Sequence, residues 1–121
     1  MLHRIVELAL VALWLTPGMA LGQEGAAAGG DPEHGRELYA QYCRGCHGED
    51  GRGGAHTFMP HVDTLTKRGY IDQVPDEYLF TVIAEGGQAV GKSNYMPAWG
   101  GTLSEQDIRD LIAHIRNLPL H

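Results

Sequence analysis

The chain has too few residues, cysteines and basic side chains for several classes of protein. Its 121 residues suffice for one domain but not for a barrel enzyme or a two-domain catalyst. Two cysteines cannot build a disulfide-dense framework. Nine Lys and Arg against fifteen Asp and Glu give a net charge of −6, so the chain lacks the basic face that nucleic-acid binding requires. With 43% apolar residues, however, its composition is not that of a disordered chain.

The apolar run near the N-terminus is too short to span a bilayer. Leu8–Leu15 contains eight apolar residues, whereas a membrane-spanning helix needs about 20. Arg4 lies in the short charged opening before this run, and Thr16–Gly18 and then Ala20–Gly22 follow it. This is the layout of a secretory signal peptide, so we predict that residues 1–22 are removed on export. A membrane anchor formed by an uncleaved N-terminal segment is the alternative.

The remaining chain divides into a short lead-in and one domain. Residues 23–30 (QEGAAAGG) are rich in small side chains and predict a flexible lead-in, which leaves residues 31–121 as the folded domain. The signal peptide contains one basic and one acidic residue, Arg4 and Glu7, so its removal leaves the net charge at −6. A domain of about ninety residues has a marginal core and usually needs a staple or a cofactor.

Two helices are predicted in the first two thirds of this domain. Asp31, followed by a proline and a glutamate, is a strong helix start, and the helix runs into Cys43. A second helix begins near Pro75–Asp76 and stops at Gly86. Because residues 78–84 include β-branched and aromatic side chains, a strand is the alternative there.

The third predicted helix has the clearest pattern. Ser104 as N-cap with Asp107 three residues later approximates a capping box. An apolar stripe follows over Ile108–Leu118 and ends at Pro119. The expected fold class is therefore all-α, with three main helices. The long loops between them, residues 47–74 and 87–103, need something to wrap around.

The strongest functional signal is Cys43-Arg44-Gly45-Cys46-His47. C-x-x-C-H is the attachment sequence of c-type haem. The two thiols add to the vinyl groups of the porphyrin, and the adjacent histidine is placed to be the proximal iron ligand. A redox dithiol requires a βαβ setting, a zinc site requires a second ligand pair, and a disulfide is the third alternative. We predict Cys43 and Cys46 as covalent attachment points and His47 as a metal ligand.

Residues 31–120 resemble a class I c-type cytochrome. The resemblance implies the all-α cytochrome c fold, with long loops wrapped around one covalently attached haem c, and one-electron transfer rather than turnover of a substrate. It also implies that His47 is the proximal ligand, that Met96 is the distal ligand, and that the Pro60 carbonyl accepts the Nδ1–H of His47. The residues that carry it are Gly35, Leu38-Tyr39, CRGCH with Gly48, Asp50 and Gly51, Pro60, Met96-Pro97, Leu103-Ser104 and IRDLIAHIRNL.

Met96 also has support from its own surroundings. It lies in a loop bounded by proline and glycine, residues 94–100, and a rigid loop can hold a thioether against a metal. Thioether and imidazole ligands together raise the reduction potential and fill both axial positions. Met59, which also precedes a proline, is the alternative methionine, and His56 or His61 would instead give bis-histidine ligation.

The aromatic side chains near Met96 are candidates for haem contact. Tyr95 and Trp99 flank the methionine, and either can pack on the porphyrin or bond a propionate. Ordinary hydrophobic filling is an equally good interpretation. His114 stands where members of the resembling family commonly carry an aromatic residue, and we expect its neutral imidazole to pack in the same way.

A nucleotide-binding pattern is also present in the chain. Residues 86–93 match G-x-x-x-x-G-K-S letter for letter. That site requires a strand before the loop and a helix that starts at Gly-Lys-Ser. Pro97 and Gly100-Gly101 would interrupt such a helix. We therefore predict a helix stop and a loop here, with no nucleotide.

These features together predict an exported electron carrier that is not an enzyme. Its location is the periplasm, its partners are a redox donor and acceptor such as a dehydrogenase, an oxidase or another cytochrome, and no stable membrane insertion follows signal cleavage. A net charge of −6 favours a partner with a positive patch. The alternatives are a haem enzyme or gas-binding protein with an open distal site, and a fixed cytochrome subunit of a dehydrogenase or oxidase complex.

Overall fold

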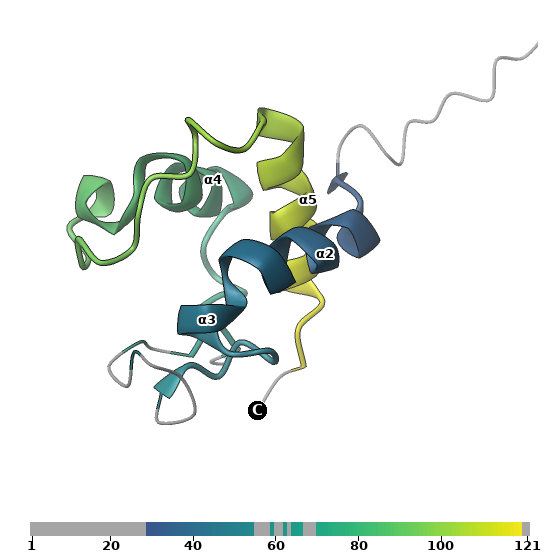
Figure 1. Cartoon of the computed structure of the whole chain (residues 1–121), viewed down its shortest axis with the longest axis horizontal. Coiled ribbons are helices and arrows are strands. Elements are labelled where there is room, and N and C mark those ends of the chain that lie inside the picture. The colour runs from purple at the N-terminus through teal and green to yellow at the C-terminus, as the bar shows by residue number, and fades with distance from the viewer. Residues whose placement is uncertain (1–28, 55–58, 60–61, 63, 67–69, 120–121) are drawn as a thin grey trace, which may run out of the picture.

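A computed structural model describes residues 29–54, 59, 62, 64–66 and 70–119 of the chain. The predicted signal peptide, most of the predicted lead-in, and three candidate site residues, His56, Pro60 and His61, lie outside these residues. The part described is helical and contains no strand, which confirms the all-α prediction (Figure 1). Its elements are α2 (Pro32–Tyr42), α3 (Arg44–His47), α4 (Asp76–Glu85), the 3₁₀ helix η2 (Gly87–Val90) and α5 (Glu105–Arg116).

Helices α2 and α4 begin and end where their local sequence indicates. The side chain of Asp31 accepts hydrogen bonds from the backbone N–H groups of Glu33 and His34, at 2.9 and 3.4 Å. This cap satisfies two donors that the first turn of α2 leaves without a helical partner. Residues 78–84 lie inside α4, so the strand alternative is wrong. Gly86 ends α4 with a φ of +87°, a conformation that glycine adopts without strain.

Helix α5 has the predicted start and an earlier end. Ser104 Oγ accepts from the Asp107 N–H, and Asp107 Oδ2 accepts from the Ser104 N–H, both at 3.0 Å, which confirms the capping box. The helix ends at Arg116 rather than continuing to Pro119. A proline disfavours the helical conformation of the residue before it, so Leu118 leaves the helix. Leu118 nevertheless stays in the core, with 7% of its surface exposed.

The main packing contact joins α2 to α5, which cross one another in Figure 1. Gly35 lies at this crossing, and a methyl group added there would overlap the carbonyl oxygen of Asp110. The glycine therefore lets the two helix backbones approach closely. Helix α4 and the segment before it complete the core against α5. The buried apolar residues are Tyr39, Cys43, Ile71, Leu79, Ile83, Leu103, Ile108, Leu111, Ile112, Ile115 and Leu118.

Arg116 fastens the end of α5 to the segment before α4. Its guanidinium donates to the carbonyl oxygens of Ile71 and Val74 and to Oδ1 of Asp76, the last at 2.8 Å from Nη2. These bonds connect residues 40 or more positions apart, and they hold the start of α4 against α5.

No helix in the described part of the chain is both long and apolar enough to cross a membrane.

Candidate functional site

The C-x-x-C-H residues occupy the corner between α2 and α3. Cys43 follows the last residue of α2 and is also the N-cap of α3, while Cys46 and His47 lie in the α3 turn. The His47 N–H donates to the Cys43 carbonyl at 3.0 Å. This single helical turn brings two thiols and one imidazole together within five consecutive residues.

Cys43 and Cys46 are not joined in a disulfide, and their environments differ. Cys43 is buried and Cys46 is partly exposed. Burial, with a smaller effect of the neighbouring Cys46, raises the pKa of the Cys43 thiol to about 12. Redox-active dithiols need a lowered thiol pKa, because the thiolate is the reactive form. The raised pKa of Cys43 therefore argues against the redox-dithiol alternative, and the disulfide alternative is not observed.

The imidazole of His47 is partly buried, and its Nδ1 atom is fully buried. Its Nδ1 atom has no hydrogen-bond partner among the described residues. Burial lowers the pKa of His47, which keeps the ring neutral. A buried polar atom without a partner costs about 1–3 kcal/mol, so this ring needs an acceptor or a metal. A neutral imidazole is also the form that ligates iron, and these residues therefore fit a haem.

The loop that carries Met96 is fastened to the end of α4 and to η2. The backbone N–H of Trp99 donates to Ile83 at 2.8 Å, and that of Gly100 donates to Ala84 at 2.9 Å. Both carbonyl oxygens belong to the last turn of α4, where the helix itself offers no partner. The Gly87 N–H in turn donates to the Met96 carbonyl at 3.1 Å. Met96 is held from both sides and is half-buried against the core.

Gly87 allows the Met96 loop to approach the end of α4 closely, and the sequence analysis did not identify this role. A methyl group at Gly87 would overlap the carbonyl oxygen of Ser93 and would lie 3.2 Å from Cβ of Met96. The Lys92 N–H also donates to the Gly87 carbonyl at 2.8 Å. A glycine pair after a helix is the available signal, since it marks a stop with close backbone approach.

The two aromatic candidates have different surroundings. Tyr95 is 76% exposed, whereas Trp99 is half-buried in the core cluster. The rings of Trp99 and Tyr42 lie 5.2 Å apart at an interplanar angle of 59°. Since Tyr42 immediately precedes Cys43, this contact brings the methionine loop to the C-x-x-C-H corner. The alternative methionine, Met59, is half-buried, and its carbonyl accepts from the Val62 N–H at 3.1 Å.

The nucleotide-binding pattern lacks its structural context. Residues 86–93 follow helix α4 rather than a strand, and they form η2 and a turn. No helix begins at Gly91-Lys92-Ser93; the next one after η2 is α5. The helix dipole and amide cradle that hold phosphate are therefore missing, as predicted from the prolines and glycines that follow.

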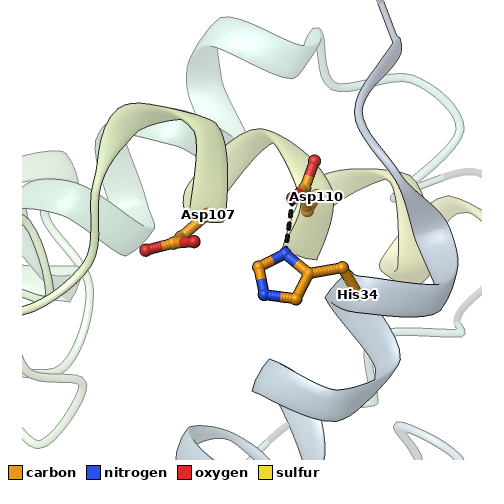
Figure 2. Close-up of side chains that lie close together, drawn as sticks. All are labelled: His34, Asp107 and Asp110. Atoms are coloured by element: carbon orange, nitrogen blue, oxygen red, sulfur yellow. Dashed lines mark hydrogen bonds and ion pairs between the residues drawn. The ribbon is translucent and has the colours of Figure 1, made fainter. Parts of the chain in front are cut away.

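A second cluster of metal-binding residue types lies between α2 and α5, and Figure 2 shows it. One ligand atom each from His34, Asp107 and Asp110 lies within 4.8 Å of the others. Each side chain already has a partner: Asp110 Oδ2 bonds His34 Nδ1 at 2.7 Å, and Asp107 Oδ2 bonds the Ser104 N–H. Asp110 Oδ1 accepts from the Asp31 N–H at 2.7 Å. The cluster is a polar tether between two helices, and sequence reasoning missed it.

His114 packs as expected for an aromatic residue at this position. Its ring lies 5.0 Å from that of Tyr39, at an interplanar angle of 58°. Burial lowers the pKa of His114, so the ring is neutral and suits an apolar contact.

Comparison with known proteins identifies the family. Residues 30–115 match the family described as "Cytochrome C oxidase, cbb3-type, subunit III". Cytochrome c6 of Bumilleriopsis filiformis is 33% identical over 85 residues, which cover 70% of this chain and 88% of that protein.

Solved structures show the same fold. The c-type cytochrome KustC0563 has a TM-score of 0.58 at 23% identity, over 69% of this chain and 95% of that one. Cytochrome cL from Hyphomicrobium denitrificans has a TM-score of 0.54 at 30% identity, over 70% of this chain and 45% of that one. The all-α fold, the C-x-x-C-H corner and these matches all indicate a c-type cytochrome. The chain belongs to the cytochrome c family, as a class I monohaem domain, and its cofactor is one covalently attached haem c.

Proposed function

We propose that this protein is an exported monohaem cytochrome that carries single electrons between redox proteins and is not an enzyme. The observation that carries the proposal is the C-x-x-C-H turn with its partly buried, neutral His47, whose buried Nδ1 has no partner among the residues described. Bound haem supplies a one-electron change between Fe(II) and Fe(III). The chain's own contribution is to attach, ligate and shield it.

The proximal side is formed by the corner between α2 and α3. We assign the covalent attachment to Cys43 and Cys46 and the proximal ligand to His47. A ligating histidine usually donates its other ring N–H to an oxygen, which fixes the tautomer and the ring orientation. The Pro60 carbonyl is the proposed acceptor, and it lies outside the described residues.

The distal side is formed by the loop that carries Met96. Its backbone bonds to Gly87, Ile83 and Ala84 support Met96 as the distal ligand, because a fastened loop keeps the thioether in place. A filled distal position excludes small ligands, which suits electron transfer. We also propose that Trp99, held against Tyr42, and the exposed Tyr95 contact the haem.

Absorption spectroscopy tests this proposal. Protein produced in a host that matures c-type cytochromes is recorded oxidised, reduced with dithionite, and reduced under carbon monoxide. Sharp reduced bands that carbon monoxide does not move are expected, because both axial positions are filled. A prompt shift under carbon monoxide would instead favour a haem enzyme or a gas-binding protein with an open distal site.

Export is proposed from the N-terminal sequence, with residues 1–22 as a cleaved signal peptide and the periplasm as the destination. The mass of the protein recovered from a periplasmic extract tests it. A chain that begins within a few residues of Gln23 is expected, with the mass of one haem added. A membrane-bound chain that retains Met1 would favour the uncleaved anchor.

A second candidate role is a fixed cytochrome subunit of an oxidase complex. The matched family, which is named for an oxidase subunit, favours it. Gel filtration of gently prepared cell fractions separates the two roles. A mobile carrier elutes alone, below the 13.2 kDa of the uncleaved chain, whereas a fixed subunit elutes with a large membrane complex.

A further inference from the structure

Tyr39 makes a hydrogen bond to the residue that follows His47. Its side chain projects from α2 and is 2% exposed, and its hydroxyl donates to the carbonyl oxygen of Gly48 at 2.7 Å. Gly48 is the C-cap of α3 and is joined to His47 through one peptide bond. The tyrosine therefore bonds the chain next to the proposed iron ligand.

Three backbone hydrogen bonds around His47 join groups that are close in sequence. The His47 N–H donates to Cys43, its carbonyl accepts from the Gly53 N–H at 2.7 Å, and the Gly48 N–H donates to Arg44. Those bonds shape the turn but do not reach α5. The Tyr39 hydroxyl bonds this turn from the side chain of a residue in α2.

The ring of Tyr39 extends this connection to the last helix. It packs against His114 of α5, with ring centroids 5.0 Å apart. The same side chain thus touches α5 through its ring and the turn after His47 through its hydroxyl. Burial, with smaller effects of Cys43 and Asp50, raises the pKa of Tyr39, so the hydroxyl keeps its proton and remains a donor.

We propose that Tyr39 is a positioning residue, which fixes the orientation of His47 through its hydrogen bond to Gly48 and ties that orientation to the packing of α2 on α5. This inference rests on the proposed role of His47 as the proximal ligand. Proximal imidazole orientation is one of the features by which a protein tunes its haem iron. A tyrosine one helical turn before the C-x-x-C-H motif therefore affects the reduction potential without touching the iron.

The substitution Tyr39→Phe removes only the hydroxyl, and we expect the variant to fold. It keeps the ring that packs on His114, and the Gly48 carbonyl still accepts from the Gly51 N–H at 3.2 Å. Tyr78→Phe is the matched control, because it also removes one hydroxyl, which bonds the Tyr70 hydroxyl at 3.2 Å on the exposed side of α4.

Two measurements on the haem-loaded variants test the proposal: amide hydrogen exchange resolved by residue, and the midpoint potential. In Tyr39→Phe, the His47 and Gly48 amides are expected to exchange about two- to tenfold faster, the factor that one lost hydrogen bond gives. Amides of α4 keep their rates, and the midpoint potential shifts from that of the wild type. Tyr78→Phe leaves the exchange at His47 and the potential unchanged.

Two results would overturn the positioning role. One is an unchanged potential with exchange accelerated by the same factor in α2, α4 and α5, since this is the signature of a merely structural residue. The other is unchanged exchange at His47 and Gly48. Failure of the proposed function has a different signature, because wild-type protein would then bind carbon monoxide promptly or lack attached haem.

Discussion

Nδ1 of His34 lies 2.7 Å from Oδ2 of Asp110, and this pair joins the first turn of α2 to the middle of α5 (Figure 2). Asp110 is 4% exposed, and its other oxygen accepts from the Asp31 N–H and from the Gln106 side chain. A buried carboxylate is stable only when its oxygens are bonded, as they are here. The start of α2 is therefore tethered to α5 by one acidic side chain.

This tether makes stability depend on pH in a defined direction. The hydrogen bond to Asp110, opposed by partial desolvation and assisted by Asp107 and Glu37, raises the pKa of His34. Burial alone would raise the pKa of Asp110, but the bonds from His34, Asp31 and Gln106 outweigh it and lower that pKa. The His34 contribution is complete below about pH 6.5 and is lost as pH rises, while the Asp110 contribution is lost as pH falls below about 4.

We expect His34→Gln to lose more stability at pH 5 than at pH 8. Denaturant unfolding of the haem-loaded protein measures this at both pH values. Asp110→Asn and the double variant complete a mutant cycle, in which the coupling between the two residues shrinks as pH rises. Equal coupling at pH 5 and pH 8 would contradict the assigned ion pair.

Gly35→Ala tests the close contact between α2 and α5. Alanine favours a helix, but its methyl group would overlap the Asp110 carbonyl, so the helices must separate. We expect a loss of about 1–3 kcal/mol in the free energy of unfolding. Ala40→Gly, at an exposed position of the same helix, serves as the control for helix propensity and costs about 1 kcal/mol. A stability gain in Gly35→Ala would show that the helices are not in contact there.

The net charge predicts how ionic strength affects electron exchange. At −6, the reduced protein attracts a cationic oxidant and repels an anionic one. Stopped-flow oxidation by tris(phenanthroline)cobalt(III) is expected to slow as salt rises, and oxidation by ferricyanide is expected to accelerate. Rates that do not respond to salt for either reagent would argue against steering by charge.

Local features of the fold are predictable from sequence because their partners are neighbours. The Asp31 cap, the capping box of Ser104 and Asp107, and the glycine stop of α4 each involve residues within a few positions of one another. The C-x-x-C-H motif is also local, and the family comparisons agree with the cofactor it predicts. In each case the spacing alone defines the geometry.

Long-range features were missed because only the folded chain brings their partners together. His34 meets Asp110 across 76 positions, and Arg116 meets Asp76 across 40. Tyr39 was recognised as part of a family pattern, but its bond to Gly48 depends on how the chain turns after α3. The early end of α5 had a local cause, since Pro119 acts on the residue before it.

Carbon monoxide binding to two methionine variants tests the central claim most directly. In reduced Met96→Ala, loss of the proposed distal thioether leaves an axial position open, whereas Met59→Ala removes the alternative methionine and serves as the matched control. The account predicts that carbon monoxide shifts the absorption bands of Met96→Ala at once and leaves those of Met59→Ala and of the wild type unmoved. A shift in Met59→Ala, with Met96→Ala unaffected, would contradict it.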